Sequence, residues 1–488
     1  MLYTVANGLS KAAGLFLVKI QMDPTLIPTD QYGLIAILTA VVGIGGPILT
    51  LSLPLALMHI LSTTRDPDRD AAAFTTFAFV LGLVVTVGGV CIWQAEAIGA
   101  WLFDNETAGV DPGLYGSLGL AVVLATAFEA LSHLGYVLAQ IRERVVFYSA
   151  TLLSRFAVVI GANIVLVVWL GKGLEGALWA LALAGAAGAL VMNSYLLATT
   201  TWRIDLGVFR RMVRYSAPLM INSLAIPFLY AGDRLLMEEL APAITLSIYD
   251  MAAKLAGVLN VIVVQGFQSA FNAIGLKEHG ATGGGALHRR TFRHYVVFGG
   301  GFALGLSLFA GDALALLLDK DGQALLAAEP YVFPLALGLV GYGLFIIASN
   351  ILLAREKTRT ISLVVVTSAL LNLGLNVVLI PTMGAMGASL ATLVSYTVLA
   401  VGAGVAAQQS EGIRFRWEHL GGVVLVVCLL YAASRPVLEW ALVPRLAALA
   451  GLMALYPFGV LLVRVYAWSE VMRGADLVRN RIEQRRRR

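Results

Sequence analysis

The sequence predicts an all-α polytopic membrane protein of about 14 transmembrane helices, arranged as two six-helix lobes with two further C-terminal helices. Three observations support this fold class. Hydrophobic residues make up 59% of the 488 residues and charged residues only 13%, about half the charged fraction of a soluble domain. Apolar runs of membrane-spanning length recur along the whole chain. Basic residues concentrate in alternate loops between these runs.

Each predicted helix rests on an apolar run of about 20 residues, the length that crosses a bilayer. The first run carries Lys11 and Lys19. We interpret it as a retained helix that faces a polar interior, because it has neither the basic leader nor the small-residue cleavage site of a signal peptide. The candidate spans are 2–22, 32–61, 74–103, 115–140, 145–170, 174–199, 215–236, 244–276, 295–318, 331–353, 361–380, 385–407, 420–438 and 446–465.

The loops between the spans alternate in charge. One set, with the C-terminal tail, holds 25 lysines and arginines, whereas the opposite set holds only Lys172, Lys320, Arg435 and Arg445. Cytoplasmic loops of membrane proteins are enriched in lysine and arginine. We therefore predict that the basic set and both termini are cytoplasmic, which agrees with an even number of spans.

An internal repeat predicts the two lobes. Asn163-Ile-Val-Leu followed by Glu175-Gly176-Ala177 resembles Asn376-Val-Val-Leu followed by Met386-Gly387-Ala388. Repeats of six spans keep their orientation, so an axis along the membrane normal should relate the lobes. The expected organisation is a lobe at 1–200, an amphipathic linker at 201–214, a second lobe at 215–410, a helix pair at 411–466 and a basic tail at 467–488.

Eight charged residues fall well inside the predicted spans. In lipid each would cost roughly 2.5–3.5 kcal/mol, so these residues must pair or line a cavity. Cations outnumber acids, which predicts a cationic central cavity that suits an anionic diphosphate group. The acids are candidates for ion coupling. The cations are Lys11, Lys19, Arg155, Arg234 and Lys254, and the acids are Glu129, Asp233 and Asp250.

Structural roles remain open for several of these charges. Asp250 and Lys254 are four residues apart, so they lie on one helix face and could neutralise each other. Glu129 and His133 could form a packing pair by the same spacing. An arginine near the membrane interface, as predicted for Arg234, can extend its charge to water. The tail 471–488 is expected to lie on anionic lipid.

Four passages together resemble the polysaccharide flippases, the Wzx-like O-antigen and exopolysaccharide transporters. These belong to the superfamily that includes the MATE drug exporters and the lipid II flippases. The resemblance covers nearly the whole chain, and Asp250 departs from it, because relatives carry a small or uncharged polar residue there. The passages are Asp30-Gln31-Tyr32-Gly33, Asp233-Arg234-Leu235, Tyr249 with Ala252 and Lys254, and Asn372 to Thr392.

The resemblance implies a V-shaped, MATE-like pair of six-helix bundles around a central cavity. It also implies that a monomer in the bacterial cytoplasmic (inner) membrane moves an undecaprenyl-diphosphate-linked glycan between leaflets by alternating access. A polysaccharide polymerase would be its partner, and no cofactor, metal, nucleic acid or enzymatic step is implied. The alternative is a MATE-like, ion-coupled exporter of small organic molecules, which would need an acidic cavity. A membrane polymerase or glycan ligase would need a sizeable outer loop with catalytic Arg or His, and the predicted outer loops are short.

Overall fold

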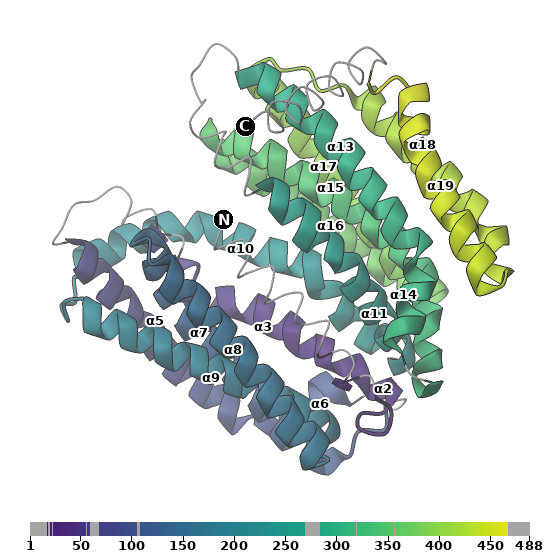
Figure 1. Ribbon diagram of the computed structural model, residues 1–488. Coiled ribbons are helices and arrows are strands. Elements are labelled where there is room, and N and C mark those ends of the chain that lie inside the picture. Colours follow the sequence, from purple (N-terminus) through teal and green to yellow (C-terminus); the bar gives the residue numbers. More distant parts are fainter. Residues whose placement is uncertain are drawn as a thin grey trace, which may run out of the picture.

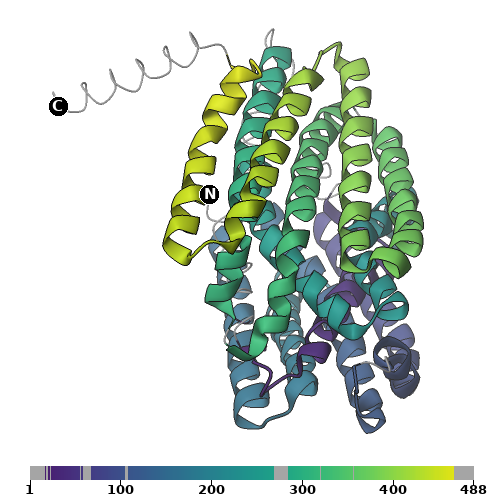
Figure 2. The same cartoon turned by 90° about the vertical axis from the view of Figure 1, so that its right-hand side faces the viewer.

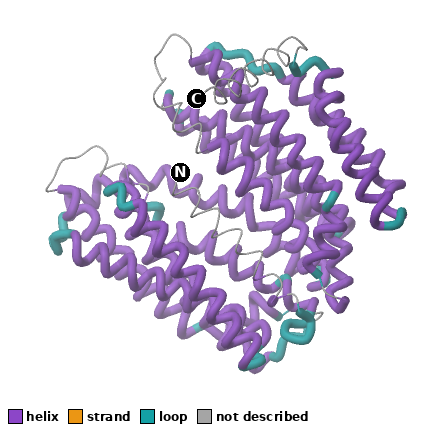
Figure 3. Tube along the Cα trace, viewed as in Figure 1, coloured by secondary structure: helices purple, strands orange, loops and turns teal. Residues whose placement is uncertain are grey.

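The computed structural model describes residues 17, 20, 21, 23–54, 56–58, 68–104, 108–268, 284–318, 320–355 and 357–466. Every regular element in these ranges is helical, and short loops gather at the two ends of the bundle (Figure 3). The principal helices are α2 (Thr29–Tyr32), α3 (Leu34–Thr50), α5 (Asp68–Trp93), α6 (Ala95–Phe103), α7 (Tyr115–Ile141), α8 (Val145–Asn163), α9 (Gly173–Thr199), α10 (Leu206–Leu240), α11 (Ala243–Leu259), α13 (Gly284–Leu308), α14 (Ala310–Leu317), α15 (Glu329–Ala354), α16 (Thr358–Met383), α17 (Ala385–Glu411), α18 (Trp417–Ser434) and α19 (Leu442–Leu462).

Within the described residues, 11 helices are long and apolar enough to cross a membrane, or 12 if the bent pair α13–α14 forms one span. The all-helical membrane fold is thus confirmed, whereas the count of about 14 is not. The predicted first span, 2–22, lies largely outside the described residues. The predicted seventh span, 215–236, is helical as part of α10 but is not among those counted.

Several predicted spans are broken rather than straight. The chain bends by 55° between α13 and α14, and α3 ends where Leu51 and Ser52 adopt left-handed backbone conformations. After α11 the chain continues as a π-helix, Asn260–Val264. A π-helix bonds residue i to i+5 and so shifts the helical register of the residues after it. Residues after Val264 therefore lie on a different face from the one that the α-helical spacing of α11 would give them.

The helices form two bundles that converge at one end and splay apart at the other (Figure 1). Helices α3 and α5–α9 make the first lobe, and α11 with α13–α17 make the second. Helix α10 lies between the lobes and packs against α3 and α16. Helices α18 and α19 pack on each other and on α13 at the edge of the second lobe (Figure 2). The converging end contains α2, α6, α11 and α14 (Figure 1).

The repeated passages occupy matching places in the two lobes. A Cβ atom added to Gly176 would lie 3.0 Å from the carbonyl carbon of Leu166, three residues after Asn163. A Cβ atom added to Gly387 would lie 2.6 Å from the carbonyl carbon of Leu379, three residues after Asn376. Only glycine lets the helices approach this closely. The similarity in sequence thus corresponds to the same tight helix-to-helix turn in each lobe.

Candidate functional site: an ion network where the lobes meet

The candidate site is built from the C-terminal part of α10, the middle of α11 and the end of α2. Helix α10 supplies Asp233 and Arg234 from its last two turns, and α11 supplies Asp250 and Lys254 from its middle. The chain turns between the two helices at Pro242, which begins α11. This hairpin brings charges 16 residues apart in sequence into contact. The buried acids and bases predicted in these two spans therefore belong to one cluster.

Arg234 links the two acids of the cluster. Its Nε donates to Asp250 Oδ1 at 3.1 Å, and its Nη1 lies 3.2 Å from Asp233 Oδ1. The side chains of both acids are only 3% exposed, and that of Arg234 is 11% exposed. The hydroxyl of Tyr249 also donates to Asp233. Breaking such a buried pair by removing one partner costs about 3–5 kcal/mol, because the other charge is left without compensation.

Lys254 extends the network from the second lobe to the segment that leads into the first. Its Nζ lies 2.8 Å from Asp250 Oδ2 and donates to the hydroxyl of Tyr32 at 2.7 Å. The ammonium also lies 4.3 Å from the centroid of the Tyr32 ring, within the range of a cation–π interaction. The Lys254 side chain is 30% exposed, which makes it the most accessible charge of the cluster.

The chain next to Tyr32 is in direct backbone contact with α11. The N–H of Gly33 donates to Ser247 Oγ at 2.8 Å. A Cβ atom on Gly33 would lie 2.6 Å from the backbone nitrogen of Ser247, closer than side-chain carbons approach. Two neighbouring contacts therefore hold the converging end together. One joins Lys254 to Tyr32, and the other is the close approach of Gly33 to the backbone of Ser247.

A second ion pair lies inside the first lobe. Arg155 of α8 and Glu129 of α7 are 2.5 Å apart, and their side chains are 27% and 34% exposed. Arg155 also passes close to Tyr136 and Gly188, so its stem fills space between α7, α8 and α9. Glu129 thus has as its ion partner Arg155, from another helix, where the sequence spacing had suggested His133. Among the described residues, no ion pair connects Arg155 to the Arg234–Lys254 cluster.

Of the eight charges predicted inside the spans, the six that the structure describes balance. Arg155, Arg234 and Lys254 are each paired with one or more of the three acids Glu129, Asp233 and Asp250. The cationic excess predicted from the sequence therefore depends on Lys11 and Lys19, which lie outside the described residues.

Sequence reasoning identified the charges but not the groups that join the lobes. Tyr32 belongs to a passage that supported the family resemblance, yet nothing in the sequence pairs it with Lys254, 222 residues away. Nothing in the sequence singles out Ser247 as a contact residue. Only the spacing of Asp250 and Lys254 predicted a contact, because residues four apart on a helix are neighbours.

Two helical lobes that converge on a buried ion network, in a chain of membrane-spanning helices, are the plan of a membrane transporter. A family model described as "Polysaccharide biosynthesis protein" matches residues 25–271, and a model described as "MatE" matches residues 218–378. Because the first covers half of the chain, the chain belongs to the polysaccharide biosynthesis protein family. A comparison with curated proteins finds no match.

Solved structures share the fold over most of the chain. The lipid II flippase MurJ, in an inward closed conformation, superposes with a TM-score of 0.73 at 12% identity, covering 96% of this chain and 99% of MurJ. An inward-facing MATE multidrug resistance transporter of the MOP superfamily gives 0.64 at 12% identity, covering 84% and 93%. A MOP superfamily transporter from Pyrococcus furiosus gives 0.61 at 13% identity, covering 84% and 94%. The chain is thus a member of the polysaccharide biosynthesis protein family with the fold of MurJ and the MATE transporters.

Proposed function

We propose that the protein moves a polyprenyl-diphosphate-linked oligosaccharide from the inner to the outer leaflet of the bacterial cytoplasmic membrane by alternating access. The observation that carries the proposal is the position of the ion network. It lies where the lobes meet, and one of its charges, Lys254, contacts Tyr32 across the junction. A diphosphate cannot cross hydrocarbon unpaired, so its carrier must offer cations on the path.

The geometry supports a specific exchange of partners. Lys254 is the accessible cation, and its attachments are Asp250 and the hydroxyl of Tyr32. A diphosphate bound near Lys254 would compete with both, because charge-assisted hydrogen bonds to phosphate are stronger than those to a neutral phenol. Release of Tyr32 would free the converging end to open. Binding of the anion and opening of the gate would then be a single coupled event.

The direction of transport follows from the basic loops. The positive-inside rule assigns the splayed end to the cytoplasm, together with both termini. The described conformation is then the one that receives substrate from the inner leaflet. In this proposal Lys11, Lys19 and Arg155 add positive charge along the path, while Glu129, Asp233 and Asp250 serve as ion-coupling or counter-charge groups. The protein works as a monomer alongside a polysaccharide polymerase.

The test is export of a labelled lipid-linked glycan from cells, at matched membrane abundance of each variant. Lys254→Gln is expected to abolish export, and Asp250→Asn with Lys254→Gln is expected not to restore it. Lys357→Gln, which removes an exposed lysine at the splayed end, is the matched control and should export normally. A fully active Asp250→Asn/Lys254→Gln double variant would show that the two residues only neutralise each other.

Lys11 tests the wider cationic path. Lys11→Gln and Lys11→Glu should both reduce export, whereas Lys11→Arg should retain much of it, because a loose anion site requires charge rather than a particular donor geometry. Export at the wild-type rate by both Lys11→Gln and Lys11→Glu would remove Lys11 from the path.

One observation favours a second candidate, a MATE-like exporter of small organic molecules. The six described charges that the sequence placed inside the spans balance instead of being cationic, and the MatE model covers all of α11 and most of α10. The two functions separate in one assay. An exporter should lower the accumulation of fluorescent organic cations in cells that lack glycan synthesis, whereas the flippase should not.

A further inference from the structure

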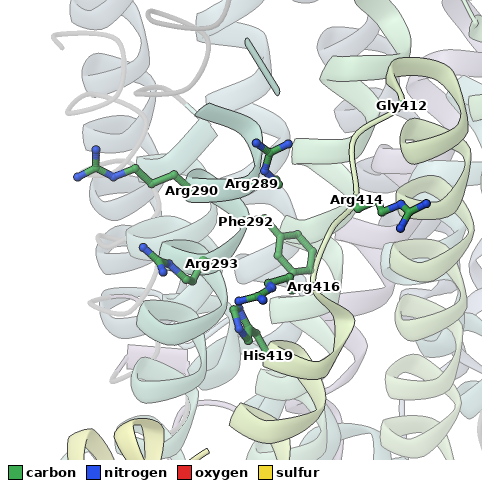
Figure 4. A pocket seen from close by; sticks show the side chains of 8 residues that line it. All are labelled: Arg289, Arg290, Phe292, Arg293, Gly412, Arg414, Arg416 and His419. Atoms are coloured by element: carbon green, nitrogen blue, oxygen red, sulfur yellow. The ribbon is translucent and has the colours of Figure 1, made fainter. Parts of the chain in front are cut away.

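A second charged site lies at the splayed end of the molecule, on the second lobe. A cavity of about 660 Å³ opens between the first turns of α13, the α17–α18 connection and the start of α18. Figure 4 shows arginines of α13 on one side, arginines of the connection on the other, and Phe292 between them. The lining residues are Arg289, Arg290, Phe292, Arg293, Gly412, Arg414, Arg416 and His419.

The connection that carries two of these arginines is a short extended segment with alternating sides. Ile413 and Phe415 are only 3% and 6% exposed. Arg414, between them, and Arg416, directly after Phe415, are exposed. Successive side chains of an extended chain point to opposite sides. The sequence Gly-Ile-Arg-Phe-Arg thus anchors itself through its apolar residues and presents its arginines together.

Aromatic packing fixes this segment against α13. The ring of Phe415 stacks on Phe292 with centroids 4.7 Å apart, and Trp417 meets Phe292 edge-on at 5.6 Å. Gln408, at the end of α17, accepts hydrogen bonds from the backbone N–H of Phe415 and from the Trp417 indole. The arginines therefore stand on a rigid support, which lowers the entropic cost of holding a ligand.

The opposite wall is supported in the same way. The guanidinium of Arg293 lies 4.7 Å from the centroid of the Tyr466 ring, and the hydroxyl of Tyr466 is hydrogen-bonded to His294. Arg290 donates to the same histidine at 3.2 Å. Aromatic contacts of this kind help to position a guanidinium through a cation–π interaction.

Charge in the pocket is strongly one-sided. Five of the eight described residues that line it are arginines, and none of the eight is acidic. Arg416 has Glu418 at 3.5 Å, but both partners of that pair are 68% exposed, so water screens their attraction. Arginines on this side are expected from the positive-inside rule alone. That rule does not explain why five surround a concave space with a buried aromatic floor.

We propose that this pocket binds a phosphate or diphosphate group, separately from the ion network between the lobes. Guanidinium groups match phosphate oxygens in pairs, and several arginines around one hollow suit a group with two or more negative charges. The pocket lies at the level of lipid head groups if the splayed end is cytoplasmic, and basic pockets there bind anionic lipids. The ligand is therefore a phosphate-bearing head group, and the site does not depend on what the protein transports.

The experiment measures binding to the purified full-length protein in detergent at low ionic strength. The probes are short-chain phosphatidylglycerol, farnesyl diphosphate and inorganic diphosphate, and phosphatidylcholine is the negative control. Arg414→Gln with Arg416→Gln should weaken binding of the preferred probe about tenfold or more, because each basic residue near a surface contributes about a factor of five. Arg203→Gln with Arg210→Gln removes the same charge from exposed sites of the linker region and should have little effect.

The probes distinguish the sources of the phosphate group. Preference for phosphatidylglycerol identifies a membrane phospholipid, preference for farnesyl diphosphate identifies a prenyl diphosphate lipid, and equal binding of inorganic diphosphate shows that the anion alone suffices. The proposal is overturned if no anionic probe binds better than phosphatidylcholine. If the Arg203/Arg210 control weakened binding equally, the proposal would also be overturned. The loss of affinity would then come from the lower net charge of the protein, not from a specific site. Because the measurement is binding, a negative transport result leaves it unaffected.

Discussion

Replacing Gly33 by alanine should open the converging end of the molecule. The added Cβ would lie 2.6 Å from Ser247 N, 2.8 Å from Leu246 Cγ and 2.9 Å from Leu246 C, whereas unbonded carbon atoms prefer about 3.5–4.0 Å. Two of these atoms belong to the backbone of α11, so a side-chain rotation cannot relieve the clash. Gly33 has a φ of −60°, so alanine introduces no backbone strain of its own.

The size of the effect follows from the cost of overpacking. Inserting one methyl group into a tight contact costs about 1–3 kcal/mol, and here that cost falls only on the conformation in which α2 and α11 touch. The equilibrium should therefore shift toward an open converging end by about 5- to 150-fold, since each 1.4 kcal/mol is a factor of ten. Gly43→Ala, in α3 directly after Gly33 and with no atom within 4 Å of the added Cβ, is the matched control.

The assay is the distance between spin labels at Asp30→Cys and Gln323→Cys, two exposed positions on opposite sides of the junction. The native cysteines, Cys91 and Cys428, are first replaced by serine. Gly33→Ala should add a population at longer distance, and Gly43→Ala should not. Identical distance distributions for the two variants would refute the conclusion that the Gly33 contact holds this end closed.

Three further predictions concern other contacts. Tyr32→Phe removes the hydrogen bond to partly exposed Lys254 and should favour the open converging end by about 1–2 kcal/mol. Tyr456→Phe, which loses a hydrogen bond between α19 and α13 far from the junction, should leave the label distances unchanged. Glu129→Gln leaves Arg155 without its carboxylate partner, so we expect the free energy of unfolding, measured by thermal unfolding, to fall by about 1–3 kcal/mol. A stability equal to wild type would show that water already solvates Arg155. The pKa of Asp205 lies below its usual value because backbone amides in the first turn of α10 donate to its carboxylate. The stability that Asp205 gives α10 as its N-cap is therefore present at neutral pH. It is lost as the pH falls through the lowered folded-state pKa. Faster hydrogen exchange of those amides in Asp205→Ala at neutral pH, and no difference in strong acid, is the expected result.

The sequence by itself determined the class of fold. Long apolar runs can be stable in a membrane only as helices that satisfy their own backbone hydrogen bonds, so composition and run length were sufficient. The repeated passages predicted the matching turns at Gly176 and Gly387, because a close helix approach requires glycine at a fixed distance from its partner. The pairing of Asp250 with Lys254 was also readable, since it depends only on helical periodicity.

The tertiary structure decided which charges meet and where helices break. The partnerships of Arg234 with Asp250, of Arg155 with Glu129 and of Lys254 with Tyr32 depend on how separate helices pack, which periodicity does not encode. The bend between α13 and α14 and the π-helix after α11 arise within runs that look continuous by hydropathy. The arginine pocket was visible in sequence only as basic loops. Its concave form depends on Phe292 and Phe415, 123 residues apart, which stack to bring two charged segments together.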